Sequence, residues 1–155
     1  LSVDENSLIG TAAAPTIAGA DVDDGENGEL SYSIIGGTGE DIFAIGETSG
    51  VVTVAKEGEL NYEDLDKDDY TLKVKVTDGG GLSAEATFNV EADNINEKPV
   101  LKDAARKILE NSASPSKAGS PIQGTDPDNG HPVNGIVQQM LYYVTGGSGK
   151  GVFKI

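Results

Sequence analysis

The sequence predicts an all-β fold, a Greek-key β-sandwich of about seven strands that occurs in tandem copies. Three observations predict it. Apolar and polar residues alternate along short segments, turn-forming residues separate these segments, and blocks of sequence recur at a constant spacing. The composition agrees with this fold class, because 21 of the 155 residues are glycine and only 5% are aromatic. Such a composition is typical of short strands joined by tight turns.

The strands are clearest in the middle of the chain. Residues 70–77 alternate between apolar and polar side chains, the period of two that places one face against a core and the other in water. A glycine-rich turn at 78–81 separates them from residues 84–91, which alternate in the same way. No segment shows a helical period. Further strands are predicted at 30–34, 43–45 and 52–54, the last two flanking a turn at 48–50.

The chain contains an internal repeat. Two blocks recur at an offset of 105 residues, and two later blocks recur at an offset of 110. The second copy therefore carries five extra residues between Asp128 and Met140, where a loop accommodates them at little cost. The matching blocks of the first and second copies are 5–7 with 110–112, 21–23 with 126–128, 30–37 with 140–147, and 43–45 with 153–155.

The repeat predicts two domains. We expect residues 1–98 to form one complete copy, with a linker at 93–99, and residues 99–155 to form the first half of a second copy. Half a sandwich cannot bury both of its sheets, so we expect the parent protein to contain the remainder. No apolar run reaches membrane-spanning length, so a membrane anchor is expected only outside this chain.

The charge balance limits the partners of the chain. Its 26 acidic and 11 basic residues give a net charge of −15, which repels nucleic acid and anionic lipid and attracts divalent cations. Two carboxylates about 4 Å apart repel by up to about 4 kcal/mol at an effective dielectric constant near 20. The chain has no cysteine, so something other than disulfides must stiffen it outside the cell.

The acidic residues lie at strand ends and between the copies, and together their motifs resemble those of a cadherin repeat. The resemblance covers nearly the whole chain, as one complete repeat and the first half of a second. The matching motifs are Glu5-Asn6, Asp21-Val22-Asp23 with Asn27-Gly28, Leu60-Asn61-Tyr62-Glu63, and the linker Asn94-Ile95-Asn96-Glu97-Lys98-Pro99.

The resemblance implies Ca²⁺ as the cofactor, with up to three ions at the junction between the copies. Hard cations such as Ca²⁺ bind six to eight oxygen atoms. Asn61 stands where the family usually has Asp, which removes a charge but keeps an oxygen, and Asp66 and Asp68 compete with Glu63. The implied ligands are the shared carboxylates of Glu5, Glu63, Glu97 and Asp128, the Asn61 side chain, Asn96, Asp126 and the Asn134 carbonyl near the second copy, and the carbonyls of Ile95 and Lys98.

The linker has two registers. Anchoring the motif on Asn96-Glu97 places Asn94 at the first acidic position, whereas anchoring it on Pro99 places Asp93 there. The first register keeps an Asn–acid pair and is preferred, and Asp93 remains an alternative ligand. The same family pattern assigns Asp21, Asp23, Asn27 and Asp78 to a junction with a preceding repeat, and Glu110 to a following one.

Several other motifs receive a simpler interpretation. An EF-hand is excluded, because the run from Asp64 has Asp69 where that loop requires glycine and Lys75 where it requires glutamate. Residues 146–151 form a flexible turn, since Gly151 stands where a phosphate loop has Ser or Thr. The one histidine, His131, lacks the arrangement of a catalytic nucleophile. Asp24, Asp41, Asp64 and Asp103 are interpreted as turn formers or caps.

The sequence therefore predicts a non-enzymatic, calcium-dependent module of an extracellular adhesion or structural protein, at the cell surface or secreted. Ca²⁺ at the junction between repeats would make the tandem array rigid. The expected partners are adjacent repeats of the same chain and another protein at the cell surface, of the same or a different kind, with no nucleic acid. The alternative is a carbohydrate- or ligand-binding sandwich of a large secreted protein, with Tyr142, Tyr143 and the loop at 129–139 as its binding region.

Overall fold

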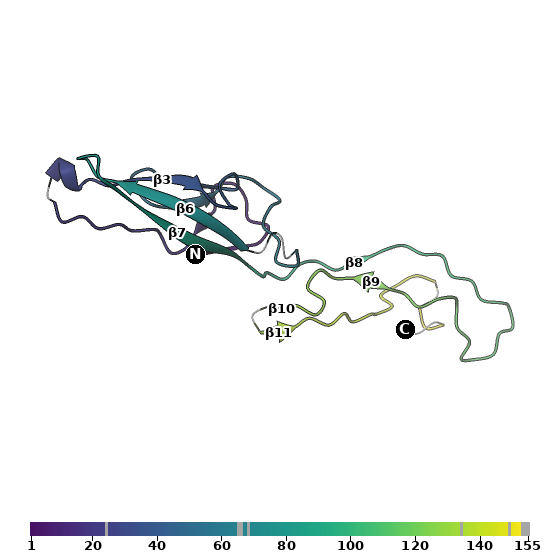
Figure 1. Ribbon diagram of the computed structural model, residues 1–155. Coiled ribbons are helices and arrows are strands. Elements are labelled where there is room, and N and C mark those ends of the chain that lie inside the picture. The colour runs from purple at the N-terminus through teal and green to yellow at the C-terminus, as the bar shows by residue number, and fades with distance from the viewer. Residues whose placement is uncertain (24, 65–66, 68, 134, 149, 153–155) are drawn as a thin grey trace. The chain divides into compact units, whose positions relative to one another are not determined.

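The computed structural model describes residues 1–155 except 24, 65, 66, 68, 134, 149 and 153–155. The chain divides into two compact units, residues 1–95 and residues 96–155 (Figure 1). The division falls inside the predicted linker, while the predicted domain bounds of 1–98 and 99–155 stay a prediction. The two units are described separately below.

The first unit consists of two β-sheets. One has four strands in the order β1-β7-β6-β3, and Figure 1 shows β6 between β3 and β7. The other has three strands in the order β2-β5-β4. Strand β1 pairs with β7 in parallel, and the other pairs are antiparallel. The elements are β1 (Ser2–Asp4), β2 (Ala12–Ala13), the 3₁₀ helix η1 (Gly25–Gly28), β3 (Ser31–Gly36), β4 (Phe43–Ile45), β5 (Val52–Val54), β6 (Asp69–Thr77) and β7 (Ser83–Asp93).

The predicted all-β class is confirmed, and the strands predicted at 30–34, 43–45, 52–54, 70–77 and 84–91 are all present. One detail differs. Alternation predicts a core-facing row in β7, but Ala84 and Ala86 are exposed, and burial begins further along the strand. The reason is a difference in length, because β2, β4 and β5 have two or three residues each, whereas β7 has 11. The shorter sheet therefore leaves part of the longer one uncovered.

The core of the first unit lies between the two sheets. Leu72, Val52 and Val90 are completely buried, and Val54 is 1% exposed. The rings of Phe43 and Tyr70 meet edge to face, with centroids 5.7 Å apart and planes inclined at 71°, a favourable geometry for aromatic pairs. Valine and isoleucine make up seven of the 14 buried residues of this core.

Replacing Val90 by alanine tests the burial directly. The substitution removes about two buried methylene equivalents, so we expect the free energy of unfolding to fall by about 1.5 kcal/mol. The matched control is Val22→Ala, because Val22 is 99% exposed and its truncation should stay within about 0.5 kcal/mol of wild type. Urea denaturation of both variants measures the difference, and equal stabilities would contradict the assignment of the core.

The predicted turn at 48–50 requires glycine at its last position. Gly50 has a φ of +65°, and a Cβ there would lie 2.1 Å from the backbone oxygen of Ile17. The Ile17 N–H in turn donates to the Gly50 carbonyl at 3.1 Å. This turn therefore packs against the backbone of Ile17 at a distance that no other residue permits.

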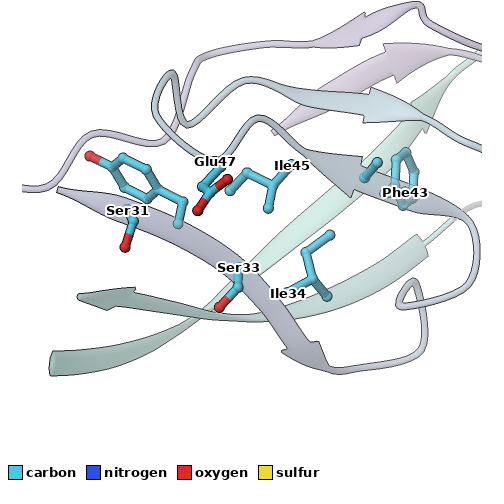
Figure 2. A pocket seen from close by; sticks show the side chains of 8 residues that line it. Ser31, Ser33, Ile34, Phe43, Ile45 and Glu47 are labelled. Carbon is cyan, nitrogen blue, oxygen red and sulfur yellow. The ribbon is translucent and has the colours of Figure 1, made fainter. Parts of the chain in front are cut away.

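A hollow of about 480 Å³ opens between the edges of β3 and β4. Figure 2 shows Ser31, Ser33 and Ile34 on one side and Phe43, Ile45 and Glu47 on the other. The two edges are joined by the Tyr32 N–H, which donates to the Glu47 carbonyl at 2.7 Å. The lining offers serine hydroxyl groups and one carboxylate, without a histidine, lysine or cysteine. This chemistry does not form a nucleophile with an adjacent base.

The second unit has only short strands among its described residues. They are β8 (Val100–Leu101), β9 (Gly124–Thr125), β10 (Pro132–Val133) and β11 (Ile136–Val137). Strand β8 pairs with β9, and β10 pairs with β11, both antiparallel. The β10–β11 hairpin contains much of the loop that is longer than its counterpart in the first copy. Val133 is the only fully buried apolar residue in the described part of this unit.

Asn6 and Asn111, which the internal repeat pairs, have the same backbone conformation. Asn6 has a φ of 55° and Asn111 a φ of 59°. They are the only non-glycine residues with positive φ in the described part of the chain, and Asn tolerates this left-handed region better than most residues. Each copy therefore begins with a Glu-Asn pair of the same local geometry.

Candidate calcium-binding residues

Glu5 lies directly after β1 and is 1% exposed, although it is a carboxylate. Its Oε2 accepts the N–H of Tyr62 at 3.0 Å, and its Oε1 accepts the N–H of Ile95 at 2.9 Å. The Glu5 N–H itself donates to the Asp93 carbonyl at 3.0 Å. One side chain therefore connects the end of β1, the loop at 61–63 and the start of the linker.

These hydrogen bonds explain how the carboxylate is tolerated in the interior. A buried charge is costly unless polar groups compensate it, and a carboxylate accepts strong hydrogen bonds from backbone N–H groups. A carboxylate has about four lone-pair positions, and the two N–H groups use two of them. The remaining positions are available to a cation.

The loop that contains Glu63 has its own internal support. Leu60 is 2% exposed and fixes the start of the loop in the core. The Asn61 side-chain oxygen accepts the N–H of Asp64 at 3.0 Å, so Asn61 stabilises the turn with the oxygen that the resemblance assigns to Ca²⁺. Glu63 is half-buried, and one of its carboxylate oxygens lies within 4.8 Å of one from Glu5. The competing residues Asp66 and Asp68 lie outside the described residues.

The two linker registers predict different ligands, Asp93 or Asn94, and these two residues differ in burial. Asp93 is the last residue of β7 and its side chain is exposed. Asn94 is half-buried, and both polar atoms of its amide are buried without a hydrogen-bond partner among the described residues. An amide that is buried in this way is rare unless a ligand or water satisfies it. The geometry therefore favours Asn94 over Asp93 as the ligand, while both assignments stay predictions.

In the second unit, Asp128 is a buried carboxylate that accepts a backbone N–H group, as Glu5 does in the first unit. It is completely buried, and its Oδ2 accepts the N–H of Glu97 at 2.6 Å. Its Oδ1 is buried without a hydrogen-bond partner among the described residues. Carboxylate oxygens of Glu97 and Asp128 lie within 4.8 Å of each other. Asp128 thus attaches the beginning of this unit to its Asp-x-Asp loop.

The Asp-x-Asp loops of the two units have the same local structure. The Asp128 N–H donates to Asp126 Oδ1 at 3.2 Å, and the Asp23 N–H donates to Asp21 Oδ1 at 2.8 Å. In both loops the first Asp therefore orients the second by a local side-chain to backbone hydrogen bond. Asp126 is half-buried, whereas Asp21 and Asp23 are exposed.

The remaining predicted ligands are less constrained. Asn96 is exposed and its amide contacts the Glu97 carbonyl at 3.5 Å, and the Lys98 side chain is exposed. Asn134 lies outside the described residues. The set assigned to a preceding junction lies around η1 and the β6–β7 turn, where Asp78 Oδ1 accepts the Leu82 N–H at 2.8 Å. Glu110 is exposed, and nothing in the structure tests its assignment.

Sequence reasoning found these side chains but missed their backbone partners. Ile95 was expected to contribute its carbonyl to Ca²⁺, and the structure adds that its N–H holds Glu5. The N–H groups of Tyr62 and Glu97 were not predicted at all. The alternation of side chains along the strand could have indicated Asn94. Val90 and Ala92 face the core, so a period of two places residue 94 on the inner side and Asp93 on the outer side.

A two-sheet sandwich with carboxylates held at strand ends and in the linker has the features of a calcium-binding, β-sandwich adhesion module. Comparison with known families identifies the class, since residues 1–92 match the model of the cadherin domain. The chain belongs to the cadherin family. The resemblance seen in the sequence is therefore confirmed.

Individual relatives agree with this assignment. The chain is 37% identical over 112 residues to human cadherin-related family member 2, an alignment that covers 70% of this chain and 8% of the relative. It is 31% identical over 144 residues to human protocadherin Fat 4, covering 90% of this chain and 3% of the relative. The chain thus spans less than a tenth of the length of these proteins.

Solved structures show the same fold. Extracellular cadherin domains 3–6 of protocadherin gamma B2 match with a TM-score of 0.57 at 25% identity, covering 84% of this chain and 33% of that one. Mouse cadherin-23 EC22–24 matches with a TM-score of 0.54 at 22% identity, covering 82% and 40%. Both are tandem cadherin structures, in agreement with the predicted architecture.

Membership of the cadherin family establishes several general properties. A cadherin domain is a non-enzymatic adhesion module, so the prediction that the chain is not an enzyme is confirmed. Cadherin domains generally bind Ca²⁺, and cadherin family proteins are typically extracellular and at the cell surface. In the described part of the chain, no helix has the length and apolar character needed to cross a membrane.

Proposed function

We propose that this chain is a calcium-dependent module of an extracellular adhesion or structural protein, in which Ca²⁺ bound between consecutive repeats makes the array rigid. The observation that carries the proposal is a pair of close carboxylates in each unit, one buried and one half-buried. These are Glu5 with Glu63 and Glu97 with Asp128, the four residues that the family resemblance assigns as shared ligands.

The donor set suits Ca²⁺ rather than a softer metal. Every proposed ligand is an oxygen, from a carboxylate, an amide or a backbone carbonyl, and Ca²⁺ binds six to eight such atoms. Histidine and cysteine, which zinc and copper favour, are absent from the proposed set. The proposed ligands are Glu5, Asn61, Glu63, Asn94 or Asp93, Ile95, Asn96, Glu97, Lys98, Asp126, Asp128 and Asn134.

The residues of the chain prepare this site before an ion arrives. Glu5 and Asp128 are each held by backbone N–H groups, so their carboxylates lose little conformational freedom on binding. Without a cation, the two carboxylates of each pair repel each other. Bound Ca²⁺ supplies the positive charge that turns this repulsion into attraction, and the linker then becomes ordered.

An extracellular location would suit a calcium site of this kind. Extracellular modules bind Ca²⁺ with dissociation constants of about 10⁻⁴ to 10⁻³ M. We propose an extracellular location, with adjacent repeats as intramolecular partners and another protein at the cell surface as the external one. The carbohydrate-binding alternative has less support, because the Tyr142 hydroxyl is engaged by a backbone N–H of its own unit and only Tyr143 of the pair is exposed.

The test is thermal unfolding of the full chain in chelator, in 1 mM Ca²⁺ and in 1 mM Mg²⁺. With a dissociation constant of about 10⁻⁴ M, 1 mM Ca²⁺ stabilises the folded state by about 1.4 kcal/mol per site. For a domain the size of the first unit, residues 1–95, we expect the melting temperature to rise by about 6–11 °C. A shift no larger in Ca²⁺ than in Mg²⁺ would mean that these acids are ordinary surface charge.

A further inference from the structure

Two tyrosines make the same hydrogen bond in the two units. The Gly19 N–H donates to the Tyr32 hydroxyl at 2.8 Å, and the Gly124 N–H donates to the Tyr142 hydroxyl at 3.0 Å. The internal repeat pairs Tyr32 with Tyr142 and Gly19 with Gly124. The bond is therefore repeated although the two copies differ in the length of the loop between its partners.

Glycine allows the hydroxyl to come close. A Cβ on Gly19 would lie 3.3 Å from the Tyr32 hydroxyl and 2.9 Å from Leu30 Cδ1. A Cβ on Gly124 would lie 3.5 Å from the Tyr142 hydroxyl and 3.2 Å from Met140 Sδ. A larger residue at position 19 would crowd the Tyr32 hydroxyl. One at position 124 would stand at ordinary contact distance from the Tyr142 hydroxyl and would crowd Met140 Sδ and the Val100 carbonyl oxygen, at 3.2 Å each.

The pair stands directly before the ligand loop. Gly124 belongs to β9, where it pairs with Leu101 of β8, and Asp126 follows two residues later. The Asp128 N–H then bonds to Asp126, and Asp128 bonds to the Glu97 N–H. The tyrosine hydroxyl therefore holds the first residue of β9, the strand that leads into this chain of hydrogen bonds.

We propose that Tyr142 is a positioning residue for Ca²⁺, and that Tyr32 has the same role for the loop of Asp21 and Asp23. The proposal rests on the proposed calcium function. The tyrosine does not contact the ion. It restricts the backbone that carries Asp126 and Asp128, and a ligand set that is already ordered binds more tightly than one that must be ordered on binding.

The main test compares Tyr142→Phe with wild type in the full chain, using calorimetric titration with Ca²⁺. A hydrogen bond of this kind contributes about 0.5–1.5 kcal/mol, so we expect the dissociation constant to rise about three- to tenfold. The first control is Tyr143→Phe, because Tyr143 is 74% exposed. Its affinity should equal that of wild type.

The second control is Tyr32→Phe, which removes the same bond from the first unit. The loop that Tyr32 orients lies near the β6–β7 turn, where β7 begins, while the linker follows the end of β7. An 11-residue strand spans about 36 Å, so Tyr32→Phe should weaken Ca²⁺ binding only at the loop of Asp21 and Asp23 and leave the affinity of the Asp128 site unchanged. A merely structural role would predict similar losses for both tyrosines.

The outcomes separate the two proposals. If wild type binds Ca²⁺ and Tyr142→Phe binds equally well, the positioning role is wrong and the calcium function stands. If wild type does not bind Ca²⁺, both are wrong. If Tyr142→Phe is also less stable than wild type without metal, weaker Ca²⁺ binding alone does not establish a positioning role. Amide hydrogen exchange of the Gly124 N–H in metal-free wild type then tests whether the hydrogen bond orders this backbone. We expect a protected Gly124 N–H, and an unprotected one would overturn the proposal.

Discussion

Replacing Asp128 by alanine should reduce the affinity of the chain for Ca²⁺ by on the order of a hundredfold, equivalent to about 2.7 kcal/mol. Asp128 is completely buried, with Oδ2 holding the Glu97 N–H and Oδ1 buried without a hydrogen-bond partner among the described residues. The substitution removes a proposed shared ligand and releases the backbone of a second, Glu97. Bonds to charged groups contribute about 1.5–3 kcal/mol each. Calorimetric titration measures the change.

Asp103→Ala is the matched control for this variant. Asp103 is an exposed acid of the same unit, and its removal changes the net charge by the same amount. Asp128→Asn should bind with an intermediate affinity, because it keeps an acceptor for the Glu97 N–H but loses the charge. Equal affinities for the Asp128→Ala and Asp103→Ala variants would show that general electrostatic attraction, and not a defined site, accounts for binding.

Replacing Glu5 by alanine should lower the free energy of unfolding by about 2–6 kcal/mol in millimolar Ca²⁺, because two partly buried N–H groups lose their acceptor at about 1–3 kcal/mol each. These are the N–H groups of Tyr62 and Ile95. Urea denaturation of the variant and of wild type measures the loss. The effect combines structural support with the loss of a calcium ligand, so a second comparison is needed to separate them.

Glu5→Gln provides that comparison when both variants are studied in chelator. Both substitutions remove the charge, and both relieve the repulsion from Glu63 equally. Only glutamine retains an oxygen that accepts one of the two N–H groups. We therefore expect Glu5→Ala to be less stable than Glu5→Gln by about 1–3 kcal/mol without Ca²⁺. Equal stability of the two variants would show that the hydrogen bonds of Glu5 do not support the fold.

The sequence predicted the long strands of the first unit and the short strands β4 and β5, but it gave no bounds for β1 and β2. Strand β6 alternates over nine residues, which is enough to show a period of two. Strands β1 and β2 have three and two residues, too few for any period. The parallel pairing of β1 with β7 joins segments from opposite ends of the first unit, and no local pattern reports such a contact. The exposure of Ala84 and Ala86 depends on the length of another sheet.

The candidate site was predictable as a set of side chains, because the internal repeat and the family motifs mark them. The backbone hydrogen bonds that hold these side chains in place were not predictable. Glu5 accepts N–H groups from residues 57 and 90 positions away along the chain, and backbone donors have no sequence signature. The Gly-Tyr pairs were also missed, although the repeat contains both residues, because their hydrogen bond appears only when the strands are placed in space.

We propose that Ca²⁺ makes the junction between the repeats rigid. The most direct test of this proposal is the distribution of distances between spin labels on two introduced cysteines, Thr87→Cys and Lys117→Cys, at exposed positions of the first and second units. The natural chain has no cysteine, so only these sites react. We predict a broad distribution in chelator and a narrow one in millimolar Ca²⁺, with no narrowing in the Asp128→Ala variant. Equal widths with and without Ca²⁺ would contradict the claim.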